Sequence, residues 1–299
     1  MMHHDIRTIQ TGRYSPLRYP GGKGKLATFV RQIIRENSLS DGHYVEPYAG
    51  GAAVAIELLL TEEVSRVSIN DVSPQIFSFW HSLLHRTEEL CKLVTDTLIS
   101  VEEWDRQKQV LRQPENEDPL AIGFATFFLN RTNRSGILNA GIIGGREQKG
   151  EWKIDARYNA RELEGRIKAI ANLSARIQLS NLDAVDFLEK GGATWGARTL
   201  VYLDPPYYVK GKHLYHHFYR HSDHVEVCAA LSHLQDQRWI VSYDAVPEIE
   251  EIYAATPWLK YSIGYSARAH MAGQEIMFFG PGVTAPEVVG SMQEIDRSA

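Results

Sequence analysis

The sequence contains no long apolar run. None of its segments approaches the ~18 unbroken apolar residues that a membrane-spanning helix requires. Residues 1–13 are polar and carry no apolar stretch of the kind found in secretion signals. From these absences we expect no membrane span and a cytoplasmic location.

Cysteine is almost absent as well. Cys91 and Cys228 are the only two, and their wide separation predicts buried thiols in a reducing compartment. Histidines are more frequent after residue 212, but neither a cysteine nor a pair of acids accompanies them. We therefore expect no metal site. The histidines concerned are His213, His216, His217, His221 and His224.

The chain also lacks an excess of positive charge. Its net charge is -5 and its isoelectric point about 6.2, which taken alone argues mildly against a nucleic-acid partner. The distribution along the chain points the other way. Residues 129–168 hold nine Lys or Arg against five Asp or Glu, and residues 207–221 hold basic residues and aromatics without any acid. Basic residues interleaved with aromatics suit a loop that follows a nucleic-acid backbone and stacks on bases.

Two common nucleotide-binding signatures are missing. No G-x-G-x-x-G follows a predicted strand, which disfavours a nicotinamide cofactor. The Gly- and Lys-rich residues 19–25 resemble a phosphate-binding loop, but that pattern needs Gly where Tyr19 stands and Ser or Thr where Leu26 stands. A lysine on such a glycine loop can instead bind a carboxylate, and a solvated turn is the alternative.

Strands and helices alternate along most of the chain. We expect helices between several of the strands, and residues 73–131 to be helical with a break at 114–119. This alternation predicts an α/β fold with a doubly wound, mostly parallel sheet. Residues 15–83 and 159–281 would form the sheet domain, 84–158 a helical and irregular insert, and 284–299 a loose tail. The predicted strands are 43–46, 64–70, 177–180, 199–203, 239–243, 259–263 and 275–279.

The tetrad Asp204-Pro205-Pro206-Tyr207 directly follows one of these strands. In an open parallel sheet, ligands bind beyond the carboxyl ends of the strands. The carboxylate and the Pro205 carbonyl can both accept hydrogen bonds from a planar amino group, and Tyr207 offers a ring for stacking on an extruded base. A plain strand-to-loop turn is the alternative, because Pro-Pro marks turns in any case.

Two further features suit a nucleoside ligand. Residues 44–52, Tyr-Val-Glu-Pro-Tyr-Ala-Gly-Gly-Ala, run from a strand through a glycine turn into a helix, which lets a ligand approach the backbone at a helix N-terminus. Asp71 ends the next strand, 25 positions after Glu46, where an acid commonly binds ribose hydroxyls. A packing turn and a helix N-cap are the respective alternatives.

Together and in this order, these motifs resemble the Dam-type DNA adenine methyltransferases. The likeness runs from about residue 15 to residue 280, and it implies a seven-stranded-type methyltransferase sheet with S-adenosylmethionine as cofactor. One departure is Tyr19, where many relatives carry Trp; another is Gly51-Ala52-Ala53 in place of Gly-x-Gly-Ser. The resemblance implies catalytic roles for Asp204, Pro205, Pro206 and Tyr207, and cofactor-binding roles for Tyr19, Gly21, Lys23, Glu46, Pro47, Gly50, Asp71, Asp183 and Asp204.

The resemblance further implies a double-stranded DNA substrate whose target adenine is flipped out of the helix. The family places its target-recognition region in the insert, where 130–136 read Asn-Arg-Thr-Asn-Arg-Ser-Gly. We expect no membrane partner and, by default, a monomer. The DNA-binding candidates are Arg131, Asn133, Arg134, Lys210 and Lys212.

Other acceptors remain open from the residues alone. The tetrad could serve the amino group of cytosine in DNA, of RNA, or of a protein amide. Family members that act on cytosine usually carry Ser at the first position, so Asp204 favours adenine. A non-catalytic module that binds DNA or cofactor is the alternative from another class, and the intact tetrad argues against it.

Overall fold

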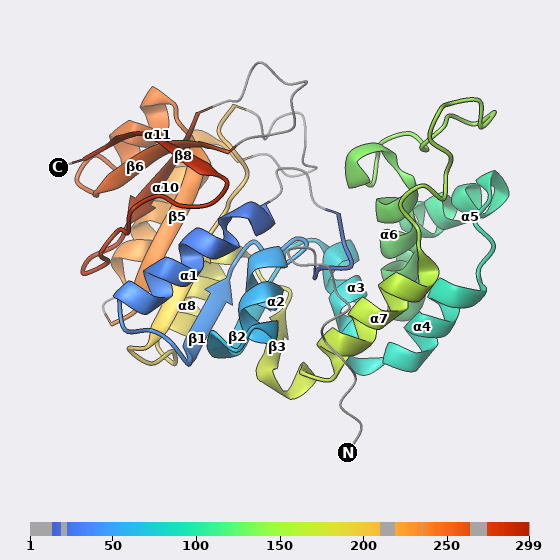
Figure 1. The fold of residues 1–299 in the computed structure, drawn as a ribbon, viewed down its shortest axis with the longest axis horizontal. Coiled ribbons are helices and arrows are strands. Elements are labelled where there is room, and N and C mark those ends of the chain that lie inside the picture. Colours follow the sequence, from blue (N-terminus) through green and yellow to red (C-terminus); the bar gives the residue numbers. More distant parts are fainter. Residues whose placement is uncertain (1–13, 19–22, 210–218, 235, 264–273, 299) are drawn as a thin grey trace.

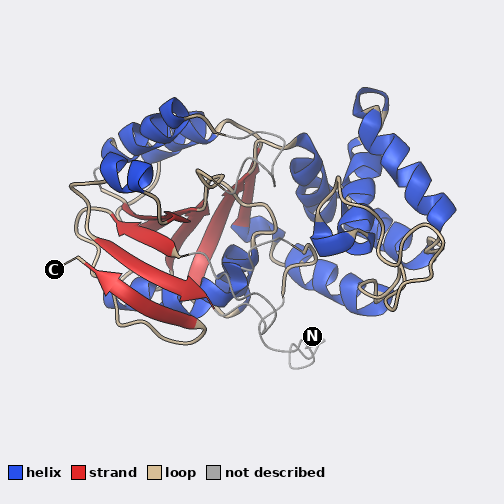
Figure 2. Cartoon of the chain, turned by 90° about the horizontal axis from the view of Figure 1, so that it is seen from above, coloured by secondary structure: helices blue, strands red, loops and turns tan. Residues whose placement is uncertain are grey.

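The chain folds into a twisted sheet flanked by helices, with a helical part beside it (Figures 1 and 2). This computed structural model describes residues 14–18, 23–209, 219–234, 236–263 and 274–298. Both parts share buried side chains, and a continuous hydrophobic core runs from the sheet into the helices beside it.

The sheet has eight strands in the order β3-β2-β1-β4-β5-β7-β6-β8. The first five in this order are mutually parallel, while β7 is antiparallel to β5, and β6 is antiparallel to both of its neighbours. The sheet is therefore mixed, and four of its seven strand pairs are parallel. The bounds are β1 Gly42–Glu46, β2 Val64–Asn70, β3 Ile177–Ser180, β4 Thr199–Leu203, β5 Arg238–Asp244, β6 Trp258–Ile263, β7 Glu275–Phe279 and β8 Met292–Arg297.

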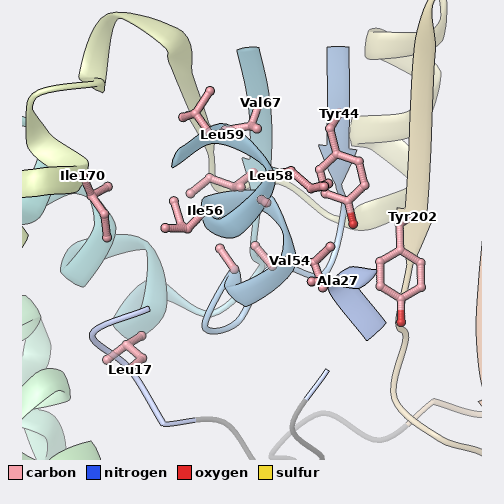
Figure 3. Close-up of a cluster of buried hydrophobic side chains, with 14 of the residues drawn as sticks. Leu17, Ala27, Tyr44, Val54, Ile56, Leu58, Leu59, Val67, Ile170 and Tyr202 are labelled. Carbon is pink, nitrogen blue, oxygen red and sulfur yellow. The ribbon is translucent and has the colours of Figure 1, made fainter. Parts of the chain in front are cut away.

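Alternating apolar side chains bury both faces of the parallel strands. Tyr44 of β1 and Tyr202 of β4 pack with α1 (Ala27–Glu36) and α2 (Ala53–Leu60), and Figure 3 shows this cluster around α2. On the other face, Val45 and Val201 pack with α8 (Ala184–Gly192), α10 (His221–Ser232) and α11 (Pro247–Ile252). Helices therefore cover both faces, as the doubly wound prediction requires.

The helical part contains α3 (Pro74–His85), α4 (Thr87–Asp96), α5 (Val101–Arg112), α6 (Pro119–Thr132) and α7 (Ala160–Ala171). Side-chain caps begin several of these helices. Ser73 accepts from the Ile76 N–H, and Pro74 follows at the first helical position. The predicted break falls at the short 3₁₀ helix η3 (Pro114–Asn116), after which Asp118 caps α6.

Aromatic packing joins α6 to its neighbours. The Phe127 ring stacks on Phe79 of α3 with centroids 5.8 Å apart, and Tyr158 packs edge-on against Phe127 at 5.6 Å. The insert helices therefore pack on α3 and, through α4, on α7. The helical part thus includes α3 and α7, which lie outside residues 84–158.

The prediction of a loose tail at 284–299 is wrong. Met292–Arg297 form β8, which pairs with β6 at the edge of the sheet. Only Met292 of this strand is buried, and the others are mainly polar. Backbone pairing, rather than an apolar pattern, makes this strand, so periodicity could not reveal it.

Among the described residues, no helix is long and apolar enough to cross a membrane. No group of three or more His, Cys, Asp or Glu side chains in the same residues could hold a metal ion. This part of the chain also contains the short 3₁₀ helices η2 (Lys23–Leu26), η4 (Arg134–Gly136) and η5 (Ser174–Arg176).

Candidate active site

The carboxyl ends of the parallel strands lie at a single edge of the sheet. Glu46 ends β1, Asp71 follows β2, Asp183 follows β3 and Asp204 follows β4. The strand order reverses between β1 and β4, and ligands of such sheets bind at this reversal. The fold therefore brings Glu46 and Asp204, which are 158 positions apart, to the same edge of the sheet.

The turn after β1 is held in place by Asp71. Gly50 has a φ of 47°, a left-handed conformation that glycine adopts without strain. Its N–H donates to Asp71 Oδ2 at 2.8 Å, and the Ser73 N–H donates to Oδ1 at 2.9 Å. Burial raises the pKa of Asp71 to about 6, while these two N–H groups lower it. Asp71 therefore joins the glycine turn to the start of α3.

Asn70 is a residue that the sequence reading missed. Its side chain is fully buried, and Nδ2 donates to the carbonyls of Pro47 and Leu182, each at 3.0 Å. Its Oδ1 accepts from the Leu182 N–H at 2.9 Å. One amide thus links the loops that follow β1 and β3. An asparagine at the end of a buried strand, directly before Asp71, is the signal that could have drawn attention to it.

Glu46 is buried at the end of β1. Its Oε1 accepts from the Tyr44 hydroxyl at 3.1 Å and from the Ala55 N–H at 3.0 Å, which ties β1 to α2. Burial is the largest cause that raises the pKa of Glu46, to about 8, and the charge of Asp204 adds to it. Glu46 is therefore mostly protonated at neutral pH.

Asp204 is held from the neighbouring strand. The Ser242 hydroxyl of β5 donates to Asp204 Oδ1 at 3.1 Å, and Tyr202 Oη lies 3.0 Å from Ser242 Oγ. Asp204 is half-buried, Pro205 is buried, and Pro206 and Tyr207 are half-buried. The tetrad is thus partly accessible, and its carboxylate is anchored.

Asp244, a second missed residue, holds the chain after the tetrad. Its Oδ1 accepts from the Tyr208 N–H at 2.9 Å and its Oδ2 from the Val209 N–H at 3.0 Å. The side chain is 4% exposed at the end of β5. A carboxylate directly after a predicted strand was visible in the sequence, but its partners were not.

Aromatic rings surround His224 beside the tetrad. The His224 ring lies 5.2 Å from that of Tyr208, 5.4 Å from that of Tyr219 and 5.4 Å from that of Tyr243. Tyr219 and Tyr48 place their hydroxyl oxygens 3.0 Å apart. Burial lowers the pKa of His224 to about 4, so the imidazole is neutral at physiological pH.

Asp183 caps α8. Its side chain accepts from the Val185 N–H at 2.8 Å and is exposed at the same edge as Asp71. The main-chain carbonyl of Asp71 accepts from Asn181 Nδ2 at 2.6 Å. Asp183 therefore lies in a loop that is bonded directly to the loop of Asp71.

Two of the DNA-binding candidates are inside the protein. Arg131 is 8% exposed and donates from Nε to the Pro16 carbonyl at 2.8 Å. Asn133 is fully buried; its Oδ1 accepts from Trp104 Nε1 at 2.6 Å, and its Nδ2 donates to two carbonyls. Arg134 is exposed. Arg134 therefore lies at the surface, whereas Arg131 and Asn133 support the segment from inside the protein.

The remaining candidates are placed in part. Pro47 lies in the turn after β1, where its carbonyl accepts from Asn70, and Lys23 begins η2. Tyr19, Gly21, Lys210 and Lys212 lie outside the described residues.

Comparison with known proteins identifies relatives. A model of the D12 class N6 adenine-specific DNA methyltransferases matches residues 19–265. The Type II methyltransferase M.MjaIII of Methanocaldococcus jannaschii is 24% identical over 209 residues, which cover 64% of this chain and 68% of that protein.

Two solved structures are more distant. An rRNA methyltransferase of Streptomyces viridochromogenes is 13% identical with a TM-score of 0.36, over 86% of this chain and 85% of that one. A conserved hypothetical protein of Streptococcus pyogenes is 12% identical with a TM-score of 0.31, over 81% and 88%. At these TM-scores neither bears on the function.

Proposed function

Because this chain belongs to the D12 class N6 adenine-specific DNA methyltransferase family and is an enzyme that methylates adenine in DNA, we propose that residues 204–207 are its catalytic site. The observation that carries this proposal is the position of Asp204. Its carboxylate follows β4 at the strand-order reversal and is anchored by Ser242. The family's chemistry needs an acceptor for an amino group at such a place.

The tetrad suits an exocyclic amine. The amine of adenine presents two N–H donors, which Asp204 and the Pro205 carbonyl can accept together. Pro205 and Pro206 carry no N–H of their own, so neither backbone nitrogen competes for these acceptors. Accepting both bonds draws the nitrogen toward tetrahedral geometry and frees its lone pair. Tyr207 supplies a half-buried ring on which the base can stack.

The same edge fits a nucleoside cofactor. S-adenosylmethionine, the general donor of methyltransferases, supplies a methyl group already activated on a sulfonium when it is bound. Each oxygen of Asp71 accepts one main-chain N–H, which leaves acceptor capacity for ribose hydroxyls. Asp183 presents an exposed carboxylate nearby for the adenine ring of the cofactor. The residues proposed to hold it are Tyr19, Gly21, Lys23, Glu46, Pro47, Gly50, Asp71, Asp183 and Asp204.

Duplex DNA would lie against the helical part. Its target adenine must leave the stack to reach Asp204, so we include base flipping in the proposal. Arg134 is the exposed cation of the segment 130–136, and we assign it a direct DNA contact. Arg131 and Asn133 would act by shaping that segment. Lys210 and Lys212 follow the tetrad and would neutralise phosphates.

The insert offers a further surface for DNA. Trp152 is 58% exposed, and the Arg157 guanidinium lies 5.5 Å from the centroid of its ring. An exposed aromatic ring beside a cation suits stacking next to a phosphate backbone. We assign residues 15–83 and 159–281 to catalysis and 84–158 to target recognition, in an enzyme that acts as a monomer.

The test is transfer of labelled methyl from S-adenosylmethionine to unmethylated duplex DNA, followed by nucleoside analysis. We expect the label on adenine N6 and a loss of at least a thousandfold in Asp204→Ala, with cofactor affinity retained. Asp186→Ala, which removes an exposed acid of α8, is the matched control and should keep full activity. Turnover by Asp204→Ala would remove the tetrad from the mechanism.

A further inference from the structure

A line of hydroxyl groups leads from the sheet to the catalytic carboxylate. We propose that Ser242, supported by Tyr202, is a positioning residue that holds Asp204 in the orientation needed to accept the amine of the target base. This inference rests on the proposed function and adds no covalent step to it. It assigns a catalytic contribution to two residues of the sheet that lie beneath the tetrad.

Strand register places these groups together. β4 and β5 pair in parallel, with Tyr202 opposite Ile240 and Leu203 opposite Val241. One position further along, Asp204 stands opposite Ser242. Side chains alternate between the faces of a sheet, so Tyr202, Asp204 and Ser242 share the face that lies opposite Leu203. The short bond between Ser242 and Asp204 is thus a consequence of the register.

The direction of the bonds follows from counting protons. An ionised carboxylate only accepts, so Ser242 must donate its single hydroxyl proton to Asp204. Ser242 Oγ can then only accept from Tyr202, whose hydroxyl must donate. The line therefore runs Tyr202 to Ser242 to Asp204, with every donor directed toward the carboxylate.

Burial makes this line effective. Ser242 is fully buried and Tyr202 is 3% exposed, so water cannot readily replace either hydroxyl. A hydrogen bond to a charged group is stronger than one between neutral groups, and it fixes the rotation of the carboxylate.

Glu46 makes the charge on Asp204 more important. Burial together with the charge of Asp204 raises the pKa of Glu46, so the two carboxyl groups interact. A neighbouring carboxyl group makes a carboxylate harder to keep ionised, and the hydrogen bond from Ser242 favours the ionised form of Asp204.

The experiment compares Ser242→Ala and Tyr202→Phe with wild type in steady-state methylation of unmethylated duplex DNA. We expect Ser242→Ala to lower kcat about tenfold, with KM for S-adenosylmethionine within about twofold of wild type. The acid limb of its pH–rate profile should move to higher pH, because the ionised carboxylate loses a donor. Tyr202→Phe, which keeps Ser242, should show a smaller loss of about threefold.

Ser68→Ala is the matched control. Ser68 is also a buried strand serine in a hydroxyl network, bonded to His43 at 2.8 Å and Gln178 at 3.1 Å, but it lies on β2. It should leave kcat and the pH profile unchanged. Unfolding temperatures of all variants show whether any loss is structural. If Ser242→Ala does not fold, Ser242→Cys, with a weaker donor of similar size, takes its place.

The outcomes separate this inference from the proposed function. Wild-type kcat and an unshifted acid limb in Ser242→Ala, with Asp204→Asn inactive, would overturn the role of Ser242 alone. An equal loss in Ser68→Ala would also overturn it, because the effect would then be structural. No methyl on adenine in the wild type would instead overturn the proposed function.

Discussion

Replacing Glu46 with glutamine should stabilise the protein at alkaline pH, and the gain should disappear in acid. Glu46 is 5% exposed, and its Oε1 accepts from the Tyr44 hydroxyl and the Ala55 N–H. Glutamine keeps an oxygen acceptor at this position but cannot ionise. The variant therefore isolates the free energy of charging one buried carboxyl group.

The magnitude follows from the two pKa values of Glu46. Burial raises the pKa in the folded protein to about 8, against an ordinary value of 4.5. Between these values the folded state binds more protons than the unfolded chain, so wild-type stability falls as pH rises through this window. Integrated from pH 5 to pH 9, the wild type loses about 4 kcal/mol relative to Glu46→Gln.

Urea denaturation at pH 5, 7 and 9, followed by tryptophan fluorescence, measures this difference. We expect the free energy of unfolding of the two proteins to diverge steadily with pH, at a constant m-value. Glu226→Gln, at an exposed position of α10, serves as control and should track the wild type. Curves for Glu46→Gln and wild type that stay parallel from pH 5 to pH 9 would refute the reasoning.

Three further substitutions, the last with a control on helix α7, test how the sheet is built. Burial lowers the pKa of His43 to about 4, so the stability present above pH 6.5 is lost on acidification. Between pH 7 and pH 5 the wild type should lose about 2 kcal/mol of unfolding free energy relative to His43→Gln. Denaturant titrations at the two pH values measure this loss. Asn70→Ala removes three buried hydrogen bonds and should lower the free energy of unfolding by about 2–4 kcal/mol. It should also raise KM for S-adenosylmethionine. An unchanged free energy of unfolding together with an unchanged KM would contradict the linking role of Asn70. Gly42→Ala would bring a Cβ within 2.3 Å of the Arg198 carbonyl oxygen and should lower the free energy of unfolding by about 3 kcal/mol or more. Gly165→Ala, in open space on α7, is the control and should be neutral or stabilising by about 0.5–1 kcal/mol. Thermal unfolding of both variants measures the difference.

Much of the sheet was predictable from local pattern. The strand before the tetrad is an apolar run, the strand before Asp71 alternates apolar and polar residues, and both form where expected. Because parallel strands end at one edge, placing Asp71 and Asp204 at strand ends already predicted that both lie along that edge. The helix break near Pro114 is likewise local, and it is confirmed.

The supporting residues were not predictable in the same way. Asn70, Ser242 and Asp244 have ordinary surroundings in the sequence, and each acts on a loop that is distant along the chain or on a neighbouring strand. Their partners depend on strand register and on the depth of burial. β8 was missed for a related reason, since its pairing uses backbone groups that every residue carries.

The exposure of the two insert arginines was not predictable from the sequence either. Arg131 and Arg134 are three positions apart and looked equivalent as DNA contacts. One donates to the Pro16 carbonyl inside the protein, and the other lies at the surface. The difference follows from Pro16 and Arg18, which are bonded to Arg131 and Asn130 at the end of α6.

By itself, the sequence determined the reaction class, seven of the eight strands of the sheet, and the positions of the carboxylates at strand ends. These depend on residue type and short-range periodicity, which the chain carries locally. Only the tertiary structure decided which carboxylate is buried, which arginine is exposed and which hydroxyl donates to Asp204. Those properties arise from burial and from neighbours brought together by the sheet, and neither is encoded at any single position.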